Sequence, residues 1–313
     1  MSDDTRSTRI VREIFLAGFM AGLAGESLAW AASRLAREMD DVRLRAGEVL
    51  YRPGEIANEQ FLLVEGEMKL EGTGVPAWTL GEQSLIGAID VTLDRPRTRT
   101  ATATRDSHLL RVPAGAWLDL LEDSFELQRR GVEGLARGVH ALRLELDELG
   151  LDEEAPRATR SAEAPARRLD LVERIFLLRG VPLFAKGDWQ SLVSLAEFAH
   201  EVDVADGEAL FPSGASNDAM FVIVSGGVTA SRDGAERRAR FGPGMLVLGS
   251  VAVSPEDLRY AVHADTATRA LRIGHEDCFD VMEEHFLLAR SAMKALAAER
   301  EQLMNVRGGA KTP

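Results

Sequence analysis

Hydrophobic and polar residues along the chain follow three successive patterns. Residues 10–19 and 28–35 place apolar side chains three or four positions apart, which predicts two helices. Between residues 42 and 70 the apolar residues form short runs separated by glycines, which predicts short strands joined by tight turns. Residues 132–149 return to helical spacing. The predicted order is therefore helices, a set of short strands and a long helix.

This order of elements occurs twice. The segment Gly47-Glu48-Val49-Leu50 returns as Gly207-Glu208-Ala209-Leu210, and Phe61-Leu62-Leu63-Val64-Glu65-Gly66 returns as Phe221-Val222-Ile223-Val224-Ser225-Gly226. Matches at a nearly constant offset of about 160 residues predict two copies of one fold, each with its own core. We therefore expect a first domain at residues 1–150, a linker at 151–168 and a second domain at 169–313.

The long helix of the first copy has a regular apolar face. Its apolar residues alternate three and four positions apart, as in a coiled-coil seam: Val132, Leu135, Val139, Leu142, Leu146 and Leu149. Such a seam packs either on the helix's own domain or on a second copy of the chain. The spacing leaves both interpretations open, and the second predicts a homodimer.

Composition narrows the classes of partner. The chain has 313 residues, of which 45% are hydrophobic and 28% charged, enough apolar material for two globular cores. Its net charge of −13 argues against DNA as the main partner, because phosphate contacts need a basic surface. The single cysteine, Cys278, excludes a disulfide within the chain and favours a reducing cytoplasm. No apolar run approaches the roughly 20 residues that span a bilayer, so we expect no membrane insertion.

The order of elements and the two repeated segments together resemble the cyclic nucleotide-binding domain, the β-roll of the catabolite activator protein and of the regulatory subunits of cyclic nucleotide-dependent kinases. The resemblance covers residues 10–149 and 170–304. It implies a mainly β fold class with flanking helices. Two β-roll or jelly-roll (double-stranded β-helix) domains are expected, each with N-terminal helices and a long C-terminal helix.

The family's ligand cassette has a glycine turn before a short helix, a glutamate for the ribose hydroxyl and an arginine for the cyclic phosphate. In the first copy the resemblance places Gly87, Ala88, Arg97 and Thr98 at the ligand. Ala88 stands where the family has its glutamate, and Asp90 is the nearest carboxylate that could substitute. Loss of a charge-assisted hydrogen bond weakens binding by about 1.5–3 kcal/mol.

The cassette of the second copy departs further from the family pattern. The resemblance places Gly249, Ser250 and Arg259 there, but Ser250 replaces the glutamate. Leu258 falls where the arginine belongs, so Arg259 is one residue late, and such an offset turns a strand side chain to the opposite face. Any binding of cAMP or cGMP is therefore expected in the first copy, where it would be weak, and not in the second; the alternative is that both pockets bind no nucleotide.

Two other segments contain residue types that are common in binding sites. Arginines and threonines alternate between Arg95 and Arg105, which we interpret as a half-exposed strand rather than a nucleic-acid or phosphorylation site. His275, Glu276, Asp277 and Cys278 carry metal-ligating atoms, but they fall at a predicted helix start, where acidic residues satisfy free amides. We expect no metal, no further cofactor and no enzymatic activity, since neither a Walker loop nor a nucleophile elbow occurs.

Two functions remain open at this point. The resemblance implies a non-enzymatic regulatory or sensor protein for signal transduction, with cyclic nucleotide binding in the first domain. The alternative is a scaffold or protein-interaction module with degenerate pockets that bind no nucleotide. A DNA-binding regulator is disfavoured, because the family's activators carry a helix-turn-helix after the long helix and the chain ends at Pro313.

Overall fold

A computed structural model describes residues 26–148, 167–232, 238–254 and 260–310. The chain forms two compact units: unit 1 contains Met1–Gly131 and Ala297–Pro313, and unit 2 contains Val132–Leu296. Two helices, α5 (Phe125–Glu148) and α9 (Phe286–Ala310), therefore contribute residues to both units. The helix predicted at 10–19, Leu149 and nearly all of the predicted linker lie outside the described residues.

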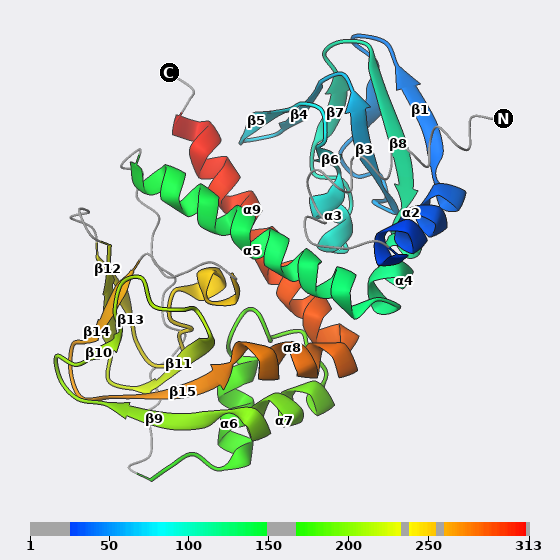
Figure 1. The fold of residues 1–313 in the computed structure, drawn as a ribbon. Helices are drawn as coiled ribbons and strands as arrows, with labels where there is room; N and C mark the ends of the chain where they lie inside the picture. Colours follow the sequence, from blue (N-terminus) through cyan, green and yellow to red (C-terminus); the bar gives the residue numbers. More distant parts are fainter. Residues whose placement is uncertain (1–25, 149–166, 233–237, 255–259, 311–313) are drawn as a thin grey trace. The chain divides into compact units, whose positions relative to one another are not determined.

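Unit 1 consists of two four-stranded antiparallel sheets with helices at one end (Figure 1). The first sheet has the order β1-β8-β3-β6 and the second the order β2-β7-β4-β5. Helix α2 precedes the strands, α3 lies between β6 and β7, and α4 follows β8. The bounds are α2 Glu26–Glu38, β1 Asp40–Leu44, β2 Val49–Tyr51, β3 Glu59–Glu65, β4 Met68–Gly72, β5 Val75–Leu80, β6 Leu85–Ile86, α3 Ala88–Thr92, β7 Thr100–Ala103, β8 Ser107–Pro113 and α4 Ala114–Glu122.

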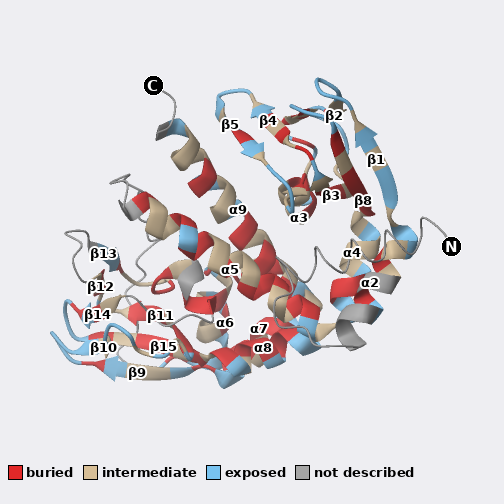
Figure 2. Cartoon of the chain, turned by 45° about the horizontal axis from the view of Figure 1, so that its top comes forward, coloured by how far each residue is buried: buried red, intermediate tan, exposed pale blue. Residues whose placement is uncertain are grey.

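The core of unit 1 follows the alternation of its strands. Leu63 on β3 and Leu109 on β8 are fully buried, while the outer strand β1 is largely exposed (Figure 2). Helix α2 covers one end of this core with Ala31 and Leu35, which are also fully buried. Because apolar area removed from water contributes about 25 cal/mol per Å², these alternating positions hold the roll together.

Unit 2 repeats the strand order of unit 1, except that its described residues have only an isolated bridge, Val222 to Leu246, in place of β6. Its sheets have the orders β11-β15-β9 and β10-β14-β12-β13, again antiparallel, and helices α6, α7 and α8 pack around them. The predicted fold class, two β-rolls with flanking helices, is therefore confirmed. The bounds are α6 Leu171–Arg179, α7 Trp189–Phe198, β9 His200–Val204, β10 Ala209–Phe211, β11 Ala219–Ser225, β12 Val228–Ser231, β13 Arg238–Phe241, a 3₁₀ helix η2 Gly249–Val253, β14 Ala261–Ala264, β15 Thr268–Gly274 and α8 His275–Glu284.

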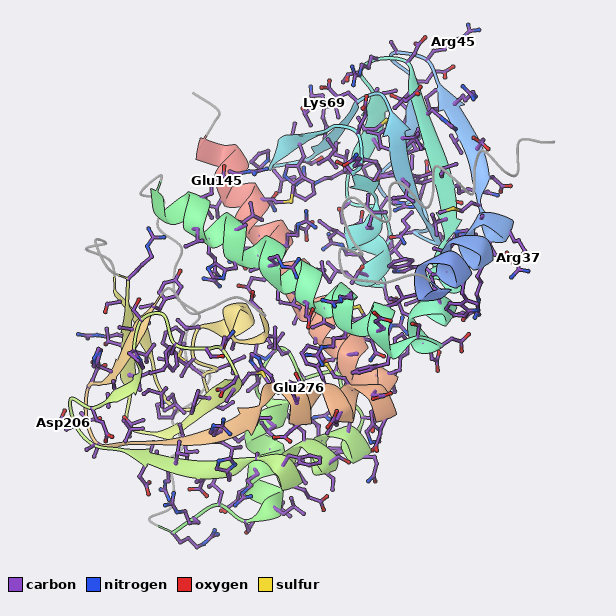
Figure 3. The ribbon with its side chains drawn as sticks, viewed as in Figure 1. Arg37, Arg45, Lys69, Glu145, Asp206 and Glu276 are labelled. Atoms are coloured by element: carbon purple, nitrogen blue, oxygen red, sulfur yellow. The ribbon has the colours of Figure 1, made fainter. Side chains whose placement is uncertain are left out.

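The repeated Gly-Glu pair closes the same tight turn in both units. The Glu48 carboxylate accepts a hydrogen bond from the Arg45 N–H (2.7 Å), and the Glu208 carboxylate accepts one from the Ala205 N–H (2.8 Å). The preceding glycine has a positive φ in each turn, a conformation that side chains disfavour. Figure 3 labels one residue at the tip of each turn, Arg45 in unit 1 and Asp206 in unit 2.

A second pair of equivalent contacts fixes the turn after the longest strand. Gly66 has a φ of 111°, and a side chain there would overlap Ser107. Gly226 has a φ of 80°, and its Cβ would lie 2.6 Å from Oγ1 of Thr268. That hydroxyl instead accepts a hydrogen bond from the Gly227 N–H (3.0 Å). The repeated glycines therefore mark positions where two backbones approach closely.

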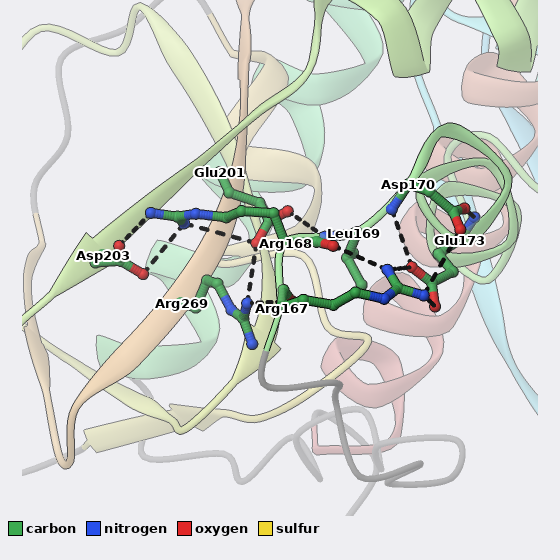
Figure 4. Close-up of polar contacts among 8 residues, drawn as sticks. All are labelled: Arg167, Arg168, Leu169, Asp170, Glu173, Glu201, Asp203 and Arg269. Carbon is green, nitrogen blue, oxygen red and sulfur yellow. Dashed lines mark hydrogen bonds and ion pairs between the residues drawn. The ribbon is translucent and has the colours of Figure 1, made fainter.

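A cluster of charged residues holds the segment before α6 against a sheet of unit 2 (Figure 4). The buried carboxylate of Glu201 on β9 accepts the Leu169 N–H (2.6 Å) and lies 3.4 Å from the Arg269 guanidinium on β15. Arg168 lies 3.6 Å from the same carboxylate and also pairs with Asp203. These contacts place the residues that lead into α6.

The predicted apolar seam lies on α5. Val132, Val139, Leu142 and Leu146 are buried in the single chain. Pairing of two chains through this seam would therefore require these side chains to exchange their present contacts, and the homodimer stays a prediction. None of the described helices combines the length and the apolar character needed to cross a membrane.

Candidate functional site

The turn at Gly87 lies at the end of a strand and the start of a helix. Strand β6 pairs with β3 through Ile86 and Phe61, and α3 begins directly after Gly87. Gly87 has a φ of 78°, and a side chain there would clash with Nη1 of Arg97. The position therefore requires glycine for both its backbone conformation and the space that Arg97 occupies.

Arg97 is the predicted phosphate ligand, and its side chain lies behind this turn. Only 3% of the residue is exposed. Its Nη1 donates to the Gly87 carbonyl (2.9 Å), its Nη2 donates to the Glu59 carbonyl, and its guanidinium lies 4.2 Å from the ring centroid of Tyr51. Among the described residues, no carboxylate pairs with Arg97. The site thus holds a buried cation whose partners are two carbonyls and an aromatic face.

Tyr51 forms the wall on which this guanidinium stacks. Burial raises the pKa of its phenol above the ordinary value, although the Arg97 cation acts in the opposite direction. The hydroxyl therefore stays neutral across the physiological range and cannot act as the missing anion. A guanidinium over an aromatic face gains about 0.5–2 kcal/mol, the more so when desolvated.

The other predicted ligands of the first copy have different surroundings. Asp90 is buried, and its carboxylate accepts hydrogen bonds from Nε of Arg95 (2.8 Å) and from Oγ1 of Thr98 (3.0 Å). The Thr98 N–H also points to this carboxylate (3.3 Å). Asp90 is thus engaged within the protein, while Ala88 offers only a methyl group.

The arginine-threonine segment differs from its interpretation as a half-exposed strand. Strand β7 begins only at Thr100, and Arg97 and Arg99 are both 3% exposed. Alternation alone does not distinguish an exposed face from one whose cations find carbonyl and aromatic partners inside the protein. The predicted alternation of faces therefore holds, with the arginines facing inward, but the prediction of a strand was wrong for residues 95–99.

Arg99 and Arg95 reach the last turns of α9, within unit 1. Arg99 lies 3.6 Å from the ring centroid of Trp78 and donates to the Pro76 carbonyl and to Oδ1 of Asn305, both at 2.6 Å. Arg95 pairs with Glu301 at 2.5 Å. Sequence reasoning missed these partners, because they are 206 residues away along the chain.

The arginines differ in their electrostatic surroundings. Burial alone would lower the pKa of Arg95, but its hydrogen bonds with Glu301 and Asp90 raise that pKa above the ordinary value. Burial lowers the pKa of Arg99, and the nearby charges of Glu301 and Asp90 offset this only in part. Both side chains remain cations at neutral pH, since arginine titrates far above it.

The corresponding turn of unit 2 has another conformation. Leu248 and Gly249 both have positive φ, and the 3₁₀ helix η2 follows where unit 1 has α3. Arg259, Leu258 and the side chain of Ser250 lie outside the described residues. The helix start predicted at His275, Glu276, Asp277 and Cys278 is confirmed, because α8 begins at His275; the His275 ring contacts the Ala252 carbonyl, and Cys278 is buried. Within the described parts of the chain, no group of three or more His, Cys, Asp or Glu could hold a metal ion.

Comparison with known proteins identifies the first β-roll. Residues 41–124 match the family model described as cyclic nucleotide-binding domain. The patatin-like phospholipase domain-containing protein 7 of Rattus norvegicus is 27% identical over 109 residues, which are 33% of this chain and 8% of that protein. A patatin-like protein of Caenorhabditis elegans, ZK370.4, is 30% identical over 77 residues, and this chain covers 6% of it. The chain therefore spans less than a tenth of these relatives.

Solved structures similar to this chain include one from Trypanosoma brucei and one from Brucella abortus. The regulatory subunit of a cAMP-independent protein kinase A from Trypanosoma brucei is 14% identical, with 91% of this chain and 92% of that chain covered and a TM-score of 0.35. A cyclic nucleotide-binding-like protein from Brucella abortus is 30% identical, with 35% and 97% covered and a TM-score of 0.32. By its sequence match, its strand order and its glycine turn with a buried arginine, the segment 41–124 belongs to the cyclic nucleotide-binding domain family.

Proposed function

We propose that this chain is a non-enzymatic regulatory protein whose unit 1 binds a cyclic mononucleotide, cAMP or cGMP, with the cyclic phosphate on Arg97. The observation that carries the proposal is the buried Arg97 guanidinium, which lies behind the Gly87 turn and pairs with no carboxylate among the described residues. The single buried cysteine fits a cytoplasmic location.

The balance of charge supports a monoanion as the ligand. Arg95, Arg97 and Arg99 contribute three positive charges, while Asp90 and Glu301 contribute two negative charges. One cation is therefore left without a counter-charge, and buried charges are costly unless they are paired. A cyclic phosphodiester carries one negative charge and offers oxygens for a charge-assisted contact with a guanidinium.

The affinity is expected to be low. Ala88 lacks the carboxylate that would accept a hydrogen bond from the ribose, and Asp90 is held by Arg95 and Thr98. The loss of one charge-assisted hydrogen bond corresponds to roughly 10- to 150-fold in affinity. In this proposal a phosphate competes with the Gly87 carbonyl for the Arg97 guanidinium, and α3, which begins directly after Gly87, moves in response.

Isothermal titration calorimetry of the full chain tests the proposal. Cyclic AMP and cyclic GMP are titrated beside 5′-AMP, with Arg97→Gln as the variant that removes the cation. Arg105→Gln is the matched control, because Arg105 is an exposed arginine of the same segment. We expect saturable heat with a cyclic nucleotide in the wild-type and control proteins, and at least a tenfold loss in Arg97→Gln.

The absence of heat at millimolar cyclic nucleotide would reject the sensor function. The scaffold or protein-interaction function would then be favoured, and one observation already supports it: the two carbonyls satisfy the Arg97 guanidinium without any ligand. A melting curve of each variant separates lost binding from lost folding, since Arg97 is buried and its replacement affects stability.

A further inference from the structure

The last turns of α9 present one polar face to unit 1. We call Ala297–Ala310 the α9 clasp. Glu301, Asn305 and Gly308 are spaced four and three residues apart, so they lie on the same side of the helix. Glu301 pairs with Arg95, Asn305 accepts from Arg99, and a Cβ on Gly308 would lie 2.5 Å from Cβ of Pro76. This face therefore contacts unit 1 through an ion pair at Glu301, a side-chain hydrogen bond at Asn305 and close packing at Gly308.

The residues that hold the clasp flank the arginine of the proposed anion site. Arg95 and Arg99 each lie two positions from Arg97 along the chain. Arg95 also joins Asp90 of α3, so one guanidinium connects the short helix after Gly87 to the clasp. The charges of Arg97, Asp90 and Arg99 all act on the phenol of Tyr51, which places them in one electrostatic neighbourhood.

We propose that the α9 clasp is a tethered competitor of the anion: its Glu301 carboxylate stabilises the arginine cluster when the site is empty, and an anion on Arg97 promotes its release. The coupling part of this inference rests on the proposed function, whereas the clasp itself does not. Glu301 and a phosphate carry like charges and are stabilised by the same cations, so each weakens the other. Linkage requires the effect to be reciprocal.

Two substitutions change the clasp in opposite directions. Glu301→Gln removes the carboxylate but keeps the size of the side chain, so the Arg95 contact weakens. Asn305→Asp adds a carboxylate opposite Arg99, so that the hydrogen bond from the cation to a neutral amide becomes an ion pair. Glu283→Gln is the charge-matched control, because Glu283 is an exposed residue of α8 in unit 2.

Hydrogen–deuterium exchange of the full chain measures how strongly the backbone amides of the α9 clasp are protected. In residues 297–310 we expect exchange about threefold to tenfold faster in Glu301→Gln, slower exchange in Asn305→Asp and no change in Glu283→Gln. Equal exchange in Glu301→Gln and Glu283→Gln would overturn the clasp. This comparison needs no nucleotide, so it tests the clasp independently of the proposed function.

A second measurement tests the coupling. We expect millimolar cyclic AMP to speed the exchange of residues 297–310, and Glu301→Gln to bind cyclic AMP about threefold to tenfold more tightly than the wild type. Calorimetric binding of cyclic AMP with unchanged exchange and unchanged affinity would overturn the competition. If cyclic AMP gives no calorimetric heat but exchange is faster in Glu301→Gln, the clasp is supported and the proposed function is rejected.

Discussion

At the scale of single residues, the turn that precedes the anion site is strained in unit 1 and relaxed in unit 2. Gln83 has a φ of 65°, and its N–H donates to the Leu63 carbonyl (2.8 Å). Gly244 has a φ of 81°, and its N–H donates to the Ile223 carbonyl (2.8 Å). The two turns have the same hydrogen bond, but only one has the residue that tolerates the left-handed region. Such a backbone costs roughly 1–2 kcal/mol for a residue with a side chain.

Reciprocal substitutions at these two positions are expected to have opposite effects. Gln83→Gly should raise the free energy of unfolding by about 0.5–1 kcal/mol, because glycine relieves the strain but has greater freedom when unfolded. Gly244→Ala should lower it by about 1 kcal/mol through the backbone alone, since no atom lies within 4 Å of its added Cβ. Denaturant titration measures both, and a loss of stability in Gln83→Gly would contradict the assignment of strain.

The sequence motif predicted Gly87 and Arg97 as site residues, and the structure brings them into direct contact. It did not predict that Asp90 is held by Arg95 and Thr98, because a carboxylate can accept hydrogen bonds from either the ligand or the protein. Nor could spacing show that Tyr51, on another strand, forms a wall of the site. Which of several donors reaches a buried acceptor depends on packing, which local sequence does not encode.

At the scale of elements, the starts of helices were the features that the sequence pattern predicted best. Trp189, Leu192, Leu195 and Phe198 have helical spacing, and α7 covers Trp189–Phe198. The Asp188 side chain caps this helix and accepts a hydrogen bond from the Ser191 N–H (2.9 Å). Burial alone would raise the pKa of Asp188, but this N–H and the nearby His285 hold the pKa below its ordinary value.

Removal of this cap should destabilise the protein in a pH-dependent way. Asp188→Ala should cost about 1 kcal/mol at neutral pH, while Asp188→Asn should retain most of the cap. Because the folded pKa is depressed, the ionised cap contributes stability above the unfolded pKa of about 4, and this is lost as pH falls through the folded value. The difference in the free energy of unfolding between wild type and Asp188→Asn should therefore shrink as the pH falls. The difference between Asp188→Ala and Asp188→Asn should change little, because neither variant has a titrating group at this position. Urea titrations from pH 7 to pH 3 measure both differences.

The short strands were also predictable, but the limits of the strand near the site were not. Glycine turns separate the strands of both units, and a glycine with positive φ is required by the backbone itself. Between Arg95 and Arg99, however, alternation suggested a strand where the structure has irregular backbone. The backbone of Arg97 exchanges hydrogen bonds with the turn at Gly54 and Glu55, and not with a strand. A two-residue period therefore does not predict sheet pairing without a partner strand.

At the scale of the whole molecule, the duplication predicted the shared strand order but not the division of residues between units. Ala297–Pro313 belongs to unit 1, although α9 begins in unit 2 at Phe286. The contacts that attach this segment are the Arg95–Glu301 and Arg99–Asn305 pairs. Pairs so distant in sequence have no local signature. Unit 1 is therefore assembled from two separate stretches of the chain, whereas unit 2 is continuous but shares α5 and α9 with unit 1.

We therefore expect one cooperative unfolding transition rather than two. Gly226→Ala places a Cβ 2.6 Å from Oγ1 of Thr268 in unit 2 and should lower the free energy of unfolding by about 2–4 kcal/mol. Loss of unit 2 disorders the start of α9, so unit 1 should melt at the same lowered temperature. Gly207→Ala, a positive-φ position with no atom within 4 Å of its added Cβ, should cost only about 1 kcal/mol. Two calorimetric peaks, of which only one moves in Gly226→Ala, would contradict the shared-helix argument.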